Sequence, residues 1–143
     1  MSAESATPDL VEVVTGLFEA ADRGDWDAMI SPYAPDAIWE SDDGILDVAG
    51  ASWVRGQLEE WADTFEDWTI AVEAVVDLGN GIVYSVYRQE GRLPGGSGVV
   101  TERGALIYEW VDGMIARVIG RRDTDEARAL AECLAHERAQ ADG

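Results

Sequence analysis

Both faces of the strands predicted in the second half of the chain are apolar. From Trp68 to Asp123, four stretches typical of β-strands are separated by glycine turns. Side chains along a strand point alternately to opposite faces of a sheet. In the second stretch, one face carries Ile82, Tyr84 and Val86, and the other carries Val83, Ser85 and Tyr87. Because neither face is typical of a solvent-exposed surface, each needs a cover. Helices can cover one side, and another element of the chain or a second subunit must cover the other, so a homodimer is the leading expectation.

Helical periodicity marks three segments before these strands. Apolar residues recur at helical spacing from Leu10 to Ala21, and the pattern stops at Gly24. Asp25 then caps a short helix that is predicted over 26–31. A third helix is predicted over 52–66, because its apolar positions form a single stripe on one face. That stripe consists of Val54, Leu58, Trp61 and Phe65, and the opposite, polar face carries Glu59, Glu60 and Asp63.

The turns between the strands are typical of hairpins. Asn80-Gly81 and Asp112-Gly113 are strong hairpin signals, so the four strands are expected to form an antiparallel meander. A last helix is predicted from Asp123 or Thr124 to about Ala139. The expected strands are 37–41, a small one at 45–48, 69–78, 82–93, 99–111 and 114–122.

This order of elements predicts an α+β fold, in which a curved antiparallel β-sheet forms a cone with helices packed on its concave face. The chain has 143 residues and no polar tract of domain size, so one domain is expected over 9–139. Residues 1–8 are predicted to be a disordered tail and residues 140–143 a frayed end. No stretch resembles a membrane span or a secretory signal, which favours a cytoplasmic location.

Composition narrows the classes of partner. The chain carries 29 acidic and 10 basic residues, a net charge of −19, which would repel nucleic acid. Solubility explains such a charge, and a cationic substrate or partner is the alternative. Cys133 and His136 are the chain's one cysteine and one histidine, too few for a zinc site, and no phosphate-binding glycine loop opens a helix. Neither a metal nor a cofactor is therefore expected.

Several short segments, taken in order, carry a family resemblance. They are Ala21–Asp27 (ADRGDWD), Tyr33–Trp39 (YAPDAIW), Gly50, Val111–Arg117 (VDGMIAR) and Arg122–Ala127 (RDTDEA). In order and spacing they resemble the SnoaL-like branch of the cone-shaped superfamily of nuclear transport factor two, over about residues 10–132. The resemblance implies a homodimer with a pocket between the concave sheet face and the helices.

The family does not decide the activity, since this superfamily includes isomerases, cyclases, hydrolases, dehydratases and noncatalytic binding modules. The ketosteroid isomerases it resembles use a base, a tyrosine and an acid, at positions that correspond here to Ser41, Leu17 and about Leu106. Ordinary isomerase chemistry is therefore not expected. The dehydratases need a pocket imidazole, and His136 is misplaced for that role.

A further comparison concerns epoxide hydrolases of the superfamily, which position water with an Arg and an Asp two residues apart. Arg88-Gln89-Glu90 has similar spacing, with Glu in place of Asp. When the strands are aligned with those of this superfamily, Tyr87 and Gln89 point inward, and Arg88 and Glu90 therefore point outward. A salt bridge at an interface is the favoured interpretation of that outward pair.

Two carboxylates are candidate catalytic groups, Glu102 and Asp42. If Leu106 faces inward, strand alternation also turns Glu102, Gly104 and Tyr108 toward the cavity. A carboxylate in an apolar pocket can act as a general acid or base. The alternative is that Glu102 is solvated or paired with Arg103 or Arg92.

Aromatic residues are expected to form the pocket walls. Six tryptophans in so short a chain fit a wide apolar cavity, which suits a polycyclic or terpenoid-like ligand. The predicted wall residues are Trp39, Trp61, Tyr87, Leu106 and Tyr108, with polar contacts from Tyr33, Ser41, Ser85 and Gln89. Trp26, Trp53, Trp68 and Trp110 are assigned to helix packing or to a dimer face.

Three hypotheses about function follow. The first is a pocket protein that binds a small apolar organic molecule without a cofactor. The second is a cofactor-independent enzyme, such as a cyclase, isomerase or epoxide hydrolase-like protein, with a pocket carboxylate as general acid or base. The third is a partner-binding module that docks through the acidic helices. A void lined by Glu102 and aromatic rings favours catalysis, a void without a carboxylate favours binding, and a filled cone favours the partner module.

Overall fold

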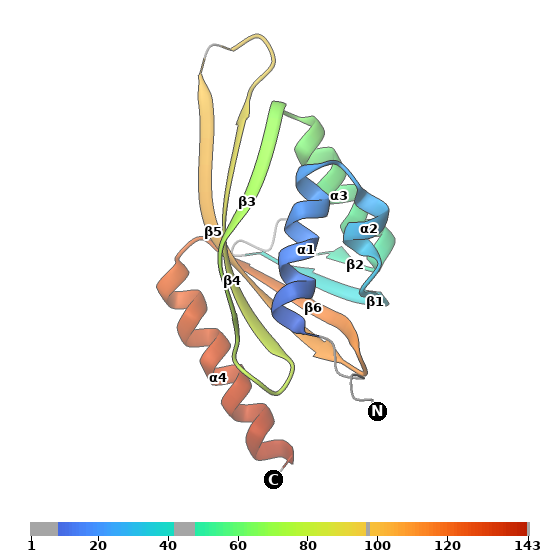
Figure 1. The fold of residues 1–143 in the computed structure, drawn as a ribbon, viewed down its shortest axis with the longest axis vertical. Helices are drawn as coiled ribbons and strands as arrows, with labels where there is room; N and C mark the ends of the chain where they lie inside the picture. The colour runs from blue at the N-terminus through green and yellow to red at the C-terminus, as the bar shows by residue number, and fades with distance from the viewer. Residues whose placement is uncertain (1–8, 42–47, 97, 143) are drawn as a thin grey trace.

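The computed structural model describes residues 9–41, 48–96 and 98–142, and Figure 1 shows a curved sheet with helices on both sides. The predicted tail 1–8, Asp42 and most of the expected small strand lie outside these ranges. The helices are α1 (Leu10–Asp22), α2 (Trp26–Ile30), α3 (Ala51–Asp63) and α4 (Thr124–Asp142). The strands are β1 (Tyr33–Glu40), β2 (Val48–Ala49), β3 (Glu66–Asp77), β4 (Ile82–Arg92), β5 (Val99–Val111) and β6 (Met114–Arg121).

The strands form one sheet in the order β2-β1-β6-β5-β4-β3. The meander β3 to β6 is antiparallel, as the hairpin turns predict. β1 pairs in parallel with β6 and begins at Tyr33, four residues earlier than predicted. Pro35 lies where the β1–β6 register shifts, between Tyr33 and Ile38. Proline has no N–H to donate and is tolerated at such irregularities, so it does not delay the strand.

Three helices cover the concave face of the sheet. In Figure 1, α1, α2 and α3 lie on the same side, and α1 runs across β3. Asp9 caps α1 by accepting hydrogen bonds from Val11 N and Glu12 N, and Asp25 caps α2. The core between helices and sheet includes Val14, Leu17 and Val54. The predicted α+β class with helices on the concave face is therefore confirmed.

α4 differs from the other helices, because it packs on the opposite face of the sheet (Figure 1). Its buried alanines, Ala127, Ala131 and Ala135, contact the face that carries Ile82 and Ile107. Small side chains allow the helix to approach the sheet closely. The second cover that the apolar strands require thus comes in part from an element of the same chain.

The junction of α3 and β3 also differs from the prediction. The helix ends at Asp63, because Glu66 already pairs with Arg92 of β4. Phe65 then leaves the helical stripe and lies against Gly91, where an added Cβ would come within 2.6 Å of the Phe65 Cβ. α4 continues to Asp142. Within the described ranges, none of the helices combines the length and the apolar character that a membrane span requires.

Candidate functional site

A cavity of about 340 Å³, hereafter the outer cavity, lies between α3 and the concave face of the sheet. α3 contributes Val54, Leu58 and Trp61, which belong to its predicted apolar stripe. The sheet contributes six side chains from β1, β4, β5 and the end of β6, which are Trp39, Tyr87, Gln89, Glu102, Leu106 and Arg121. The rest of the lining consists of Ser41, Gly120, Arg122 just after β6, the polar α3 residues Gln57 and Glu60, and Thr64, the C-cap of α3.

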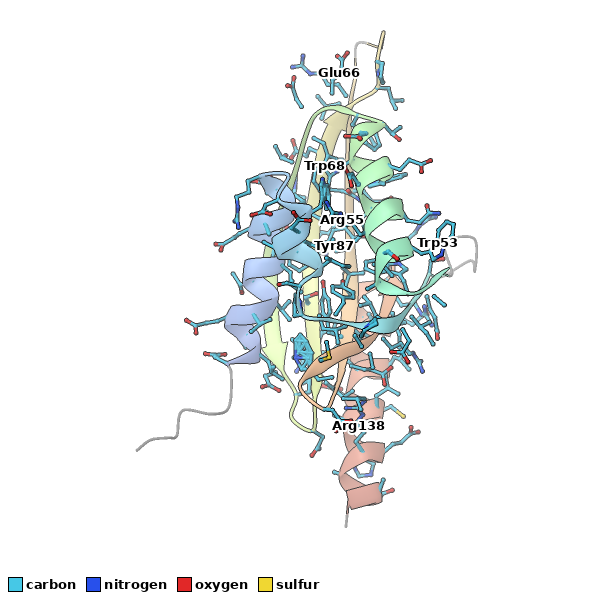
Figure 2. The ribbon with its side chains drawn as sticks, turned by 90° about the vertical axis from the view of Figure 1, so that its right-hand side faces the viewer. Trp53, Arg55, Glu66, Trp68, Tyr87 and Arg138 are labelled. Carbon is cyan, nitrogen blue, oxygen red and sulfur yellow. The ribbon has the colours of Figure 1, made fainter. Side chains whose placement is uncertain are left out.

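A smaller inner cavity of about 90 Å³ lies deeper, beneath α1 and α2. It is almost entirely apolar, with Phe18, Met29, Ile70 and the rings of Trp26 and Trp68 among its lining. Figure 2 shows Trp68 and Tyr87 between the α1–α2 pair and α3. The two cavities share a wall that consists of Trp39, Leu58, Tyr87, Gln89 and Leu106.

Gln89 is the centre of a hydrogen-bond cluster at this shared wall. Its Oε1 accepts from Trp61 Nε1 and from Trp68 Nε1, each at 2.9 Å. Its Nε2 donates to Glu102 Oε1 at 2.7 Å. Gln89 is buried, whereas Glu102 is half-buried. The cluster joins α3, β3, β4 and β5 at one point.

Glu102 therefore has the surroundings of a pocket carboxylate. It faces the outer cavity and is held by an amide, not by either of the arginines proposed as its partners in the alternative interpretation. Arg103 points to the other face and pairs with Glu73 at 2.6 Å. One oxygen of Glu102 is thus fixed by a neutral donor beside aromatic walls, and Glu60 is a second carboxylate in the lining.

Two tyrosines at the inner cavity are buried with their hydroxyls. Tyr33 and Tyr108 are 4% and 3% exposed. Burial raises the pKa of Tyr33 well above its usual value, because the phenolate would lose its hydration. Burial likewise raises the pKa of Tyr108, and the nearby phenols of Tyr33 and Tyr87 raise it further. Both groups are neutral phenols, not phenolates, at neutral pH.

The buried phenols predict a loss of stability at alkaline pH. The unfolded chain releases tyrosine protons near pH 10, whereas folded Tyr33 and Tyr108 retain them to higher pH, so the free energy of unfolding falls as pH rises above about 10. In an absorbance titration at 295 nm, at least two of the four tyrosines should ionise only together with the loss of far-ultraviolet circular dichroism. Tyr33→Phe and Tyr108→Phe should each remove one tyrosine from this late phase. Ionisation of all four in the folded protein would contradict the assignment.

Most of the predicted binding residues line one of the two cavities. Trp39, Ser41, Trp61, Tyr87, Gln89, Glu102 and Leu106 line the outer cavity, and Tyr33 and Tyr108 line the inner one. Ser85 is different: it faces the concave side but is fully buried, and its Oγ donates to Leu106 O at 2.9 Å. It lines neither cavity, because the backbone of the neighbouring strand already takes its hydroxyl. Asp42 lies outside the described residues.

The sequence interpretation missed several cavity residues. Trp26 and Trp68 were assigned to packing or a dimer face, but they lie 6.1 Å apart, ring centre to ring centre, at the inner cavity. Glu60 was placed on the polar face of α3, yet it lines the outer cavity. Helical spacing gave no signal for Glu60, because residues one or two positions apart on a helix do not share a face, and Glu60 lies next to Trp61 and two residues from Leu58. Arg121 and Arg122 gave no signal either.

The outward-facing pair on β4 forms a salt bridge, and its place at an interface stays a prediction. Arg88 and Glu90 make a salt bridge of 3.2 Å on the convex face, and both side chains are exposed. Exposed pairs of this kind contribute about 1 kcal/mol or less to stability. Among the described residues, no group of three or more His, Cys, Asp and Glu side chains is arranged to bind a metal ion.

Comparisons with known proteins agree with this architecture. The model of the SnoaL-like domain matches residues 14–118. A nuclear transport factor two-like protein from Burkholderia thailandensis has a TM-score of 0.69 at 23% identity, covering 87% of this chain and 98% of that one. A protein with a ketosteroid isomerase-like fold from Catenulispora acidiphila, in complex with trimethylamine, has a TM-score of 0.67 at 14% identity, covering 77% and 84%. TerC, co-crystallised with polyporic acid, has a TM-score of 0.66 at 18% identity, covering 85% and 97%. No curated protein matches the sequence.

Proposed function

Because the chain belongs to the SnoaL-like domain family, we propose that it is a small-molecule pocket protein that binds a mainly apolar, ring-bearing organic ligand without a cofactor. The observation that carries this proposal is the outer cavity of about 340 Å³, whose lining combines aromatic and aliphatic side chains with polar and charged ones. Such a volume and lining are typical of sites for small organic molecules. The bound polyporic acid of TerC, a structural neighbour, supports the same class of ligand.

A second function, cofactor-independent catalysis, is favoured by one specific observation. Glu102 lies on the wall of the outer cavity, and Gln89 fixes one of its oxygens at 2.7 Å. A positioned carboxylate in a mainly apolar site can transfer a proton to or from a bound ligand. The combination of an open volume, aromatic rings and an interior carboxylate is the one expected for an enzyme that performs cyclisation, isomerisation or water addition.

The partner-module hypothesis required a filled cone, and the two cavities argue against it. The homodimer remains part of the proposal. Its interface would use the part of the convex sheet face that α4 leaves uncovered. There, Arg88–Glu90 and Arg103–Glu73 form exposed ion pairs, and Val99 is 56% exposed. Alternating charges flanked by apolar side chains suit a self-complementary contact.

Native mass spectrometry of the protein purified from its own host tests both parts of the proposal. The expected species contains two chains of 15.5 kDa each and a retained small organic molecule. A second portion of the protein is denatured, so that the released molecule can be identified. A single-chain species at micromolar concentration would contradict the dimer. Full-length protein without any retained molecule, which also fails to bind apolar aromatic compounds, would contradict the pocket function.

The protein purified with its retained molecule also shows whether it only binds that molecule or converts it. Conversion of the retained molecule by the wild-type protein, and its loss in Glu102→Gln, would establish the enzyme. General acid–base groups typically contribute about 100-fold or more to a rate. Glu90→Gln is the matched control, since Glu90 lies on the neighbouring strand but faces the convex side. Binding without conversion in both proteins would leave the first function alone.

A further inference from the structure

The orientation of the Gln89 amide is fixed by the chemistry of its partners. An indole N–H is a donor only, and two of them, from Trp61 and Trp68, point at the same amide atom at 2.9 Å. That atom must be the oxygen, and its two lone pairs are then both in use. A rotated amide would place N–H donors against two N–H donors, and its oxygen against the Glu102 carboxylate. The Nε2 group is therefore directed to Glu102.

The amide is clamped from two different elements. Trp61 comes from α3 on the outer-cavity side, and Trp68 comes from β3 on the inner-cavity side. Gln89 itself is 8% exposed, so few alternative side-chain positions are open to it. Trp61 and Trp68 thus act as positioning residues: they act on a ligand through Gln89.

The Gln89–Glu102 contact uses one N–H of the amide and one oxygen of the carboxylate. An amide nitrogen carries two hydrogens and a carboxylate has two oxygens. The pair can therefore offer a ligand one N–H donor and one adjacent oxygen acceptor. Because both residues line the outer cavity, this N–H donor and this oxygen acceptor lie side by side on its wall.

We propose that Gln89 and Glu102 form a hydrogen-bonding subsite for an uncharged group in which a carbonyl oxygen stands next to an N–H or O–H donor. This inference rests on the proposed pocket function and specifies which edge of the ligand the pocket recognises. The carbonyl accepts from Gln89 Nε2, and the donor hydrogen bonds to the free oxygen of Glu102. The rings of the ligand then extend along the aromatic walls.

Two uncharged probes test the subsite. 2-Quinolone is a flat bicyclic lactam with its carbonyl and N–H on one edge, and 1-methyl-2-quinolone has the same rings but no N–H donor. A hydrogen bond to a charged acceptor changes affinity by about tenfold or more when the donor is removed. In isothermal titration at pH 7, the wild-type protein should bind 2-quinolone at least about tenfold more tightly than the methylated compound.

Three variants assign that preference to the subsite. Glu102→Gln keeps the shape but replaces a carboxylate oxygen, so the two probes should bind with similar affinity. Gln89→Leu should also abolish the preference and shift the indole N–H signals of Trp61 and Trp68 in ¹⁵N spectra, because both lose their acceptor. Glu12→Gln, at an exposed position of α1 that lines neither cavity, should retain the full preference.

The outcomes distinguish the subsite from the pocket. Equal affinity of the wild-type protein for the two quinolones would overturn the subsite, while the pocket function would stand. A preference that survives in Glu102→Gln would also overturn it, because the selective acceptor would then be another group. Failure of both probes to bind would overturn the subsite as well, and it would count against the pocket function too.

Discussion

Gly81→Ala should destabilise the protein by about 3 kcal/mol, through steric overlap and the loss of a backbone contact. Gly81 ends the β3–β4 turn with a φ of +81°, where an L-residue alone costs about 1 kcal/mol. An added Cβ would also lie 2.9 Å from Trp110 O and 2.7 Å from Arg138 Nη1. That guanidinium donates to Trp110 O at 2.8 Å and to Asn80 O at 2.9 Å, which ties α4 to the hairpin (Arg138 is labelled in Figure 2).

Gly79→Ala is the matched control for this prediction, because it lies in the same turn. Its φ is +86°, but no atom lies within 4 Å of an added Cβ. It should therefore cost about 1 kcal/mol, the backbone penalty alone. Urea denaturation of both variants measures the difference. Equal losses of stability would show that contact with Trp110 and Arg138 plays no part.

Gly120→Phe should lower the affinity of the outer cavity for an uncharged aromatic probe by about 100-fold, without unfolding the protein. Gly120 lines the cavity, and a Cβ at this position would make only ordinary contacts, 3.5 Å to Leu106 Cδ2 and 3.6 Å to Glu40 O. Because that Cβ would lie beside Leu106 in the cavity lining, we expect a phenyl ring attached to it to take space that a ligand would occupy. Binding of N-phenyl-1-naphthylamine, measured by fluorescence titration, tests the effect.

Gly56→Phe is the corresponding control on α3. It adds the same ring at an exposed helical position that does not line either cavity and has no atom within 4 Å of an added Cβ. Its affinity for the probe should remain within about twofold of wild type. Unchanged affinity in Gly120→Phe, with its thermal unfolding also unchanged, would place the binding site elsewhere and contradict the proposed pocket function.

Local patterns along the chain were sufficient to predict the meander and most of the helices. Alternation decides which side chains of β4 and β5 share a face, and the family resemblance indicated which face is inward, so the inward direction of Gln89 and Glu102 could be predicted. Their direct pairing could not, since the glycine-rich sequence between β4 and β5 does not specify the register of this hairpin. The structure pairs Gln89 with Glu102 across the two strands, and that register creates the contact.

The alternating pattern of the strands and the Asn-Gly and Asp-Gly turns determined a sheet that needs a cover on both faces, because these signals depend only on neighbouring residues. Tertiary structure decided that α4 supplies part of the second cover. It also brought Trp61 and Trp68, 28 and 21 residues away in sequence, to the same oxygen of Gln89. Such contacts depend on how helices cross a curved sheet, and local periodicity contains no information about that crossing.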